Sequence, residues 1–240
     1  MPDVRVLFLA ALAAAALILT APWLYGHFEL AAAGYAVKGV DVSHHQGEID
    51  WQALRASGVA FAYIKATEGA HFRDPRFDGN WRRSREAGIL RGAYHFFSVC
   101  KPGAEQAANF IAATPVEAQS LPHALDAEQM EACPDGERVA DPVAEILAFL
   151  DMAEKRFGRR PLLYTTREFH DAYFSGGEAK ERLANERFWL RSLHWRPRFG
   201  NGAWALWQYH NRGRRPGIDG PVDLNAFNGS VAGFEKFASP

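Results

Sequence analysis

The feature of this sequence that most constrains its fold is a repeated alternation of short apolar runs with helical segments. Several of the runs are continuously apolar, as expected for strands that are buried on both faces of a sheet. The predicted strands are 38–43, 60–67, 89–97, 121–128, 161–166, 187–193, 204–210 and 222–227. Strands that alternate with helices indicate an α/β fold with a largely parallel sheet.

The clearest predicted helix follows Asp141 and Pro142, which form an N-cap with proline in the first turn, and it stops at Gly158. A second helix is expected over 102–113. Helical segments become sparse toward the C-terminus, so the last strands should pair through short loops. We therefore predict a modified, irregular β/α barrel that resembles a TIM barrel, with an additional hydrophobic helix at the N-terminus.

Composition excludes one broad class of partner. The 240 residues are 48% hydrophobic and carry a formal charge of -1, with no run of basic residues. This is enough apolar material for one large domain, and it shows no electrostatic footprint for nucleic acid. We expect a monomer.

The N-terminus differs in kind from the rest of the chain. Residues 6–25 carry no charge and follow Arg5, and their length suits a helix that crosses a bilayer. We favour an uncleaved signal anchor over a cleaved signal peptide. The expected organisation is an anchor or signal over 1–30, a connector over 31–37 and a catalytic barrel over 38–238. The positive-inside rule then places the barrel outside the cytoplasm, membrane-anchored in the cell envelope or secreted.

Two carboxylates end the fourth predicted strand. Asp126 and Glu128 are two positions apart, so they should share one face of that strand. Close carboxylates cannot ionise independently, and a protonated acid beside an ionised partner is the arrangement used for glycoside cleavage. In a β/α barrel the active site forms where the strands end. Other predicted strand ends also carry ionisable or aromatic residues, as a sugar site requires.

Three further patterns need a structure to interpret them. Cys100 and Cys133 follow neighbouring predicted strands, so we expect a disulfide, the alternative being two unrelated thiols. His44 and His45 would point opposite ways on a strand, and no metal-ligand spacing is present, so we expect no metal and no cofactor. Trp204 and Trp207, three positions apart, would face opposite sides of their strand.

Six motifs in order make the sequence similar to glycoside hydrolase family 25, the lysozymes that act as N-acetylmuramidases. They are G-V-D-V-S-H-H-Q-G, Y-I-K-A-T-E-G, G-A-Y-H-F, L-D-A-E, W-Q-Y and V-D-L-N, spread from about 38 to 228. The resemblance implies hydrolysis of the β-1,4 bond between N-acetylmuramic acid and N-acetylglucosamine in peptidoglycan. By position, Glu128 resembles the general acid and Asp126 the second catalytic carboxylate. The substrate-binding residues implied are Asp41, Asp223, Tyr94, Lys65, Tyr209 and Gln208.

Several alternatives stay open. Two carboxylates on one strand face are poorly placed for an acid and an opposed nucleophile, so we favour attack by the substrate's acetamido group with retention, over a water-mediated inverting route. Burial and the charge of Asp126 should raise the pKa of Glu128. The competing functions are a non-catalytic peptidoglycan- or chitin-type sugar-binding protein on the same barrel, and a metal-dependent hydrolase or deacetylase of wall sugars. Chitin oligomers are an alternative substrate.

Overall fold

The computed structural model describes residues 29–239, apart from 131, 134–137, 194 and 203. The strands are β1 Lys38–Val42, β2 Phe61–Glu68, β3 Phe72–Arg73, β4 Leu90–Phe96, β5 Ala124–Ala127, β6 Leu162–Thr165, β7 Phe188–Arg191, β8 Trp204–Gly213 and β9 Val222–Phe227. The helices are η1 His44–Gln46, α2 Trp51–Ala56, α3 Phe77–Glu86, α4 Gly103–Ala113, α5 Pro142–Phe157, α6 Arg167–Tyr173, α7 Gly177–Arg182 and α8 Val231–Ala238.

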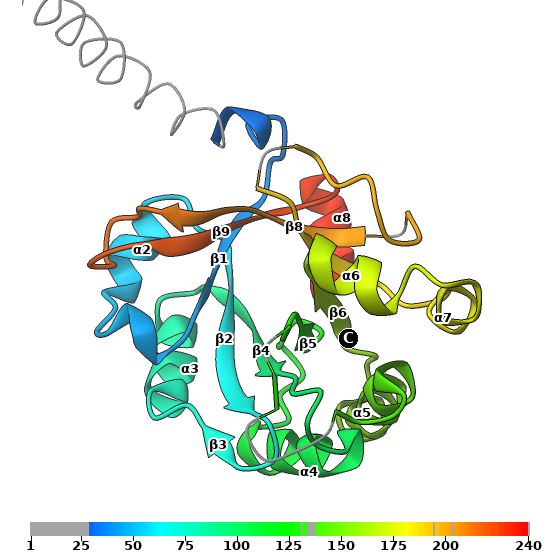
Figure 1. Ribbon diagram of the computed structural model, residues 1–240. Coiled ribbons are helices and arrows are strands. Elements are labelled where there is room, and N and C mark those ends of the chain that lie inside the picture. The colour runs from blue at the N-terminus through cyan, green and yellow to red at the C-terminus, as the bar shows by residue number, and fades with distance from the viewer. Residues whose placement is uncertain (1–28, 131, 134–137, 194, 203, 240) are drawn as a thin grey trace, which may run out of the picture.

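The strands close into a barrel. The order is β1-β9-β8-β7-β6-β5-β4-β2, with β1 also paired to β2 and the short β3 added at β2 (Figure 1). All neighbours within the ring are parallel except β9, which runs antiparallel to both β8 and β1. The predicted α/β barrel, irregular in its final third, is confirmed, and so are the predicted helices at α4 and α5.

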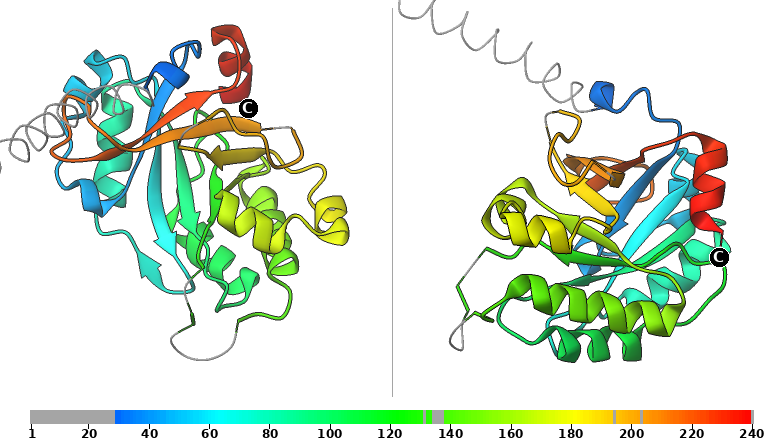
Figure 2. Two further views of the ribbon diagram at one scale, coloured as in Figure 1. Left: turned by 45° about the horizontal axis from the view of Figure 1, so that its top comes forward. Right: turned by 90° about the vertical axis from the view of Figure 1, so that its right-hand side faces the viewer.

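Helix α5 shows why these residues form helices. The Asp141 carboxylate accepts a hydrogen bond from the Ala144 amide at 2.9 Å, and Gly158 ends the helix with a φ of 74°. The buried stripe of α5 packs against α4, and the two helices lie side by side outside the barrel (Figure 2). At their closest approach a Cβ on Gly103 would lie 1.9 Å from the Glu145 carbonyl oxygen, so only glycine fits there.

One end of the barrel is filled by apolar side chains. Phe61, at the start of β2, lies 5.4 Å from Phe234 of α8 between ring centres, and Phe227 lies 5.2 Å from the same ring. Helix α8 therefore closes the end at which the parallel strands begin. The interior is apolar at that end, which leaves the carboxyl ends of the strands for polar residues.

An irregularity in β8 changes which of its side chains face inward. The register with β7 shifts around Ala205, since Phe188 pairs with Trp204 but Trp189 pairs with Leu206. Two clusters of buried apolar side chains line the sheet: an inner cluster inside the barrel, and an outer cluster between the barrel and the elements that surround it. The β-bulge places two consecutive residues, Ala205 and Leu206, in the inner cluster. The expectation that Trp204 and Trp207 face opposite sides is therefore wrong, because both belong to the outer cluster.

The segment that precedes β1 covers this outer face of β8. The Tyr35 ring lies 6.2 Å from Trp204 and 5.5 Å from Trp207, and Arg215 pairs with Glu29 at 2.9 Å. The predicted hydrophobic leader, residues 6–25, lies outside the described residues. Within residues 29–239 as described, no helix has both the length and the apolar character needed to span a membrane.

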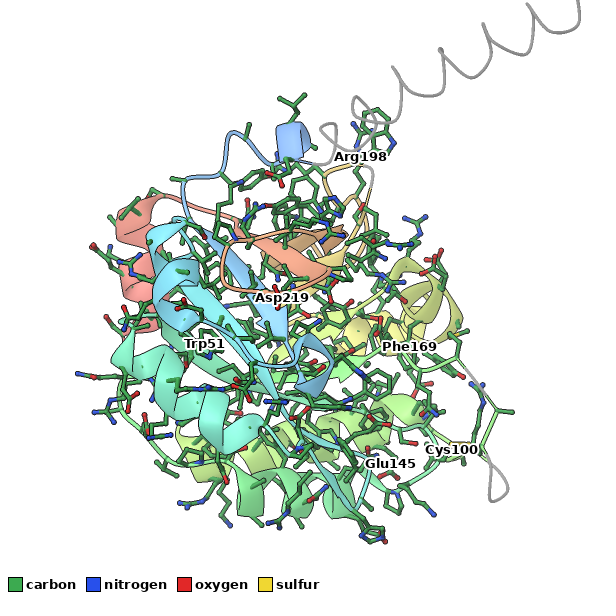
Figure 3. The ribbon with its side chains drawn as sticks, turned by 90° about the vertical axis from the view of Figure 1, so that its left-hand side faces the viewer. Trp51, Cys100, Glu145, Phe169, Arg198 and Asp219 are labelled. Carbon is green, nitrogen blue, oxygen red and sulfur yellow. A yellow bond between two sulfur atoms is a disulfide. The ribbon has the colours of Figure 1, made fainter. Side chains whose placement is uncertain are left out.

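The two cysteines form a disulfide, as predicted. Cys100 lies in the loop after β4 and Cys133 in the segment after β5, at the edge of the molecule (Figure 3). With 33 positions between its ends, the bridge should stabilise the fold by about 4 kcal/mol in the chain-entropy model. The bridge links the chain segments before and after β5, the strand that carries Asp126.

Candidate active site

A cavity of about 370 Å³ lies over the carboxyl ends of the barrel strands. Its walls include Asp41, Lys65, Tyr94, Asp126, Glu128, Gln208 and Asp223. The structure thus brings together residues from all six of the motifs found in the sequence. Tyr209 is different: the bulge in β8 turns it to the outer cluster, where its ring faces Lys38 and its hydroxyl contacts Arg215.

Asp126 and Glu128 reach the cavity together from the end of β5. Asp126 is buried, and its Oδ1 atom has no hydrogen-bond partner among the described residues. Glu128 is more open, with 25% of its side chain exposed, and its Oε2 atom lies 3.3 Å from Arg191 and 3.3 Å from the Tyr164 hydroxyl. The pair therefore combines one deep carboxyl with one at the cavity mouth.

The protonation of this pair follows from its surroundings. Burial raises the pKa of Asp126 well above its usual range, and the charges of Glu128 and Asp41 raise it further. The raised pKa of Asp126 fits its surroundings, because this carboxyl has no donor at Oδ1 and faces two other acids. The raised pKa predicted for Glu128 from the sequence stays a prediction.

A second pair of acids, Asp41 and Asp223, forms the opposite wall. The two residues are direct partners in the antiparallel register of β1 and β9 and share a hydrogen bond. Asp41 Oδ2 also accepts hydrogen bonds from Gln208 at 2.9 Å and Asn225 at 2.7 Å. Burial raises the pKa of Asp41 and these donors oppose the rise, while burial and the neighbouring Asp41 charge raise the pKa of Asp223 to about 9. We infer that Asp223 is the protonated partner that donates to Asp41.

This assignment predicts a pH-dependent stability. An acid whose pKa is raised by folding contributes stability that is complete below its unfolded pKa, near 4, and that is lost as pH rises through the folded pKa, here about 9. Asp223→Asn keeps a hydrogen-bond donor for Asp41 and cannot ionise. We expect its melting temperature to exceed the wild-type value at pH 7, by a margin that grows up to about pH 9.

Melting curves of both proteins at pH 5, 7 and 9 test this prediction. Asp219→Asn is the matched control, because Asp219 is exposed on the hairpin between β8 and β9 (Figure 3). Parallel pH profiles for wild type and Asp223→Asn would show that Asp223 is ionised in the folded protein.

Tyr94 and Lys65 contribute a hydroxyl and a cation to the floor of the cavity. They are register partners on β4 and β2. Burial and the surrounding carboxylates raise the pKa of Tyr94 well above its usual range, so its hydroxyl stays protonated. Lys65 pairs with Glu68 at 2.6 Å and also faces the cavity.

The histidines divide between support and cavity wall. His95 is fully buried and hydrogen-bonded to Thr67 and Gln106, and burial lowers its pKa to about 3, so it is a structural residue. His44 and His45 do not lie on a strand, because β1 ends at Val42 and both residues form η1. His44 binds Asp74 at 2.8 Å, while His45 lines the cavity.

Sequence reasoning missed two residues of the cavity that contact Glu128. Tyr164 lies on β6 and Arg191 ends β7, and both line the cavity. The Tyr164 hydroxyl also donates to Gln208 at 3.0 Å, which links the Glu128 wall to the Asp41 wall. Both residues lie in predicted strands, 161–166 and 187–193. The strand-end rule identifies them when it is applied to these two strands as well.

A β/α barrel with two pairs of acids and with aromatic side chains around a cavity at its strand ends defines a glycosidase. The comparison with known families agrees with this class. The family model for glycosyl hydrolases family 25 matches residues 40–218. The chain therefore belongs to glycoside hydrolase family 25.

Individual relatives support the same assignment. The chain is 38% identical to the uncharacterized protein YegX of Escherichia coli O6:H1, over 85% of this chain and 74% of that protein. It is 35% identical to lysozyme M1 of Streptomyces globisporus, over 82% and 69%. The structure of a family 25 glycosyl hydrolase from Bacillus anthracis superimposes with a TM-score of 0.74 at 35% identity, covering 85% of this chain and 94% of that one.

Proposed function

We propose that this protein is a peptidoglycan hydrolase that cleaves the β-1,4 bond between N-acetylmuramic acid and N-acetylglucosamine. The observation that carries the proposal is the Asp126–Glu128 pair, which combines a buried carboxyl of raised pKa with a more exposed one inside a single cavity. Membership of family 25 and similarity to a lysozyme point to the same chemistry. The substrate places the protein at the cell wall, outside the cytoplasm.

Glu128 is the general acid in this proposal. Its position at the cavity mouth lets it reach the oxygen that links the two sugars, and Arg191 and Tyr164 hold its Oε2 atom in place. Protonation of that oxygen is needed for the glycosidic bond to break without forming a free alkoxide. The same carboxylate can then take a proton from the water that completes the reaction.

Asp126 assists rather than attacks. Both carboxylates leave the same strand and enter the cavity from the same wall, so they cannot flank the sugar as an acid and an opposed nucleophile do. The free Oδ1 atom of Asp126 is positioned to accept the N–H of the substrate's acetamido group. The acetamido oxygen then attacks the anomeric carbon as the glycosidic bond breaks, and water later opens the ring with net retention.

Substrate binding accounts for the transfer of the proton to Glu128. Burial disfavours the charged form of Asp126, so we propose that the free protein keeps the proton of the pair on this residue. An acetamido N–H at Oδ1 stabilises the ionised form of Asp126, so the proton moves to Glu128, which the bound sugar shields from water. Each turnover returns the proton to the pair.

The oligomeric state and the N-terminal segment complete the proposed picture of the protein. The cavity is built by one chain, so we propose that the protein acts as a monomer. We also propose that residues 6–25 anchor the barrel to the membrane or direct its export, with the connector over 31–37 leading into β1.

We propose that one of the two sugars joined by the cleaved bond lies deeper in the cavity than the other. The residues that bind this deeper sugar are Asp41, Asp223, Tyr94, Lys65 and Gln208.

Analysis of the sugar ends tests the proposed bond. Purified peptidoglycan is digested with the protein from Gly34 onward, reduced with borohydride and analysed by mass spectrometry, with Glu128→Gln as the inactive control. New muramitol ends from the wild type alone are expected. Glucosaminitol ends would assign the other glycosidic bond, and release of reduced chitin oligomers in preference to wall fragments would change the substrate. No new ends from any wall preparation would leave a sugar-binding protein.

A further inference from the structure

A second cavity, of about 650 Å³, adjoins the catalytic one at the same end of the barrel. Its lining includes Arg167, Arg191, Arg196, Arg198, Trp195 and Phe199, and we call it the arginine pocket. Arg191 belongs to both cavities and pairs with Glu128 in the catalytic one. A ligand can therefore continue from one cavity into the other along this side chain.

The charge of the arginine pocket favours an anionic ligand. Four arginines line it against a single acid, Glu168. Arg167 is already neutralised by Asp171, whose carboxylate lies 2.7 Å away. Arg198 has no ion pair or hydrogen bond with any described residue, and Arg196 lies over the Trp204 ring at 5.4 Å without a carboxylate partner among those residues. Two guanidinium groups thus remain available to carboxylates from outside the protein.

The loop that carries these arginines is fixed to the barrel. The Trp207 indole donates to the Ser192 carbonyl at 2.8 Å, and the Ser192 hydroxyl donates to the Trp195 carbonyl at 2.6 Å. Trp195 nevertheless exposes 71% of its surface beside the arginines, and Arg198 projects from the edge of the molecule (Figure 3). The pocket combines a broad apolar surface with cations, which suits a short peptide that carries acidic groups.

We propose that the arginine pocket binds the peptide branch of the wall strand through its carboxylates. This inference rests on the proposed function. The amino sugars of the strand are neutral when the muramic acid carboxyl is joined to peptide, so the negative charge of such a strand lies on the branches. The muramic acid at the cleaved bond carries its branch next to the catalytic cavity. The shared residue Arg191 then marks the path of that branch into the arginine pocket.

The test compares two substrates prepared from the same uncrosslinked strands, one with its peptides intact and one stripped of them by an amidase. The variant is Arg196→Gln with Arg198→Gln. Its matched control is Lys155→Gln with Arg156→Gln, which removes two exposed charges from the last turn of α5. We expect the first variant to lose roughly three- to tenfold in kcat/KM on peptide-bearing strands, mainly through KM, because exposed ion pairs are individually weak. Stripped strands keep only the freed lactyl carboxylate, which stays on the sugar in the catalytic cavity, so the variant should cleave them at the wild-type rate.

The outcomes separate this inference from the proposed function. Equal losses on both substrates, or no loss on either, would overturn the arginine pocket as a peptide site while leaving the hydrolase intact. If the wild type cleaves neither substrate, the proposed function fails. Binding of fluorescently labelled strands then decides the inference: tighter binding of peptide-bearing strands, lost only in the Arg196/Arg198 variant, supports it, and equal binding of the two substrates overturns it.

Discussion

Replacing Glu128 by Gln should reduce kcat by about 10²- to 10⁴-fold, the range associated with loss of a general acid. The amide keeps the size of the side chain and can still contact Arg191 and Tyr164, but it has no proton to give to the leaving sugar. Initial rates on peptidoglycan measure the effect. KM and the melting temperature should stay close to wild type, because the ion pair with Arg191 is partly exposed to solvent.

Glu105→Gln is the control for this variant, since Glu105 is exposed on α4 outside the cavity. It makes the same chemical change and should retain full activity. A Glu128→Gln protein that folds normally and keeps activity within about threefold of wild type, far less than loss of a general acid costs, would show that another group supplies the proton.

Replacing Asp126 by Asn should reduce kcat by about 10²- to 10³-fold, as expected when a group that stabilises a developing positive charge becomes neutral. The neutral amide cannot compensate the positive ring that forms when the acetamido group attacks. Its melting temperature at neutral pH should equal or exceed that of the wild type, because the amide cannot ionise and so avoids the cost that burial and the charges of Glu128 and Asp41 impose on a carboxyl at this position. Loss of activity without loss of stability is the diagnostic combination.

The stereochemistry of the first product distinguishes the role of Asp126 from its alternative. Proton NMR during the first minutes of wild-type digestion should show the β-anomer, since attack by the acetamido group followed by water gives retention. Initial formation of the α-anomer would mean direct attack by water and would make Asp126 the general base.

Much of the fold could be predicted because strand and helix periodicity is local. Runs of strand length and the caps at Asp141 and Gly158 depend on neighbouring residues, and the structure confirms them. The bulge at Ala205 depends instead on how β8 pairs with β7, a non-local feature. For that reason the alternation rule failed for Trp204 and Trp207. Tyr209, which the family resemblance placed among the substrate-binding residues, faces away from the cavity.

In the candidate site, too, sequence patterns predicted some features, while contacts between distant strands determine the others. Strand-end position identified Asp126, and the family resemblance added Asp41 and Asp223. All three meet in one cavity because the carboxyl ends of the parallel strands and the start of the antiparallel β9 lie at the same end of the barrel. Their protonation could not be predicted, since it depends on donors from other strands. Asn225 and Gln208 donate to Asp41 and oppose the rise in its pKa that burial causes, whereas Asp126 lacks a donor at Oδ1. Only the assembled cavity determines which acid keeps its proton.

The antiparallel last strand also determines when the protein can become active. Asp41 lies on the first strand, but its partners Asp223 and Asn225 come from β9, more than 180 residues later in the chain. The parallel β4–β7 segment can pair as it is synthesised, yet the ring closes only when β9 inserts between β8 and β1. A chain still emerging from the ribosome therefore has no complete cavity. Hydrolysis of a glycan strand therefore begins only after synthesis of the barrel is finished.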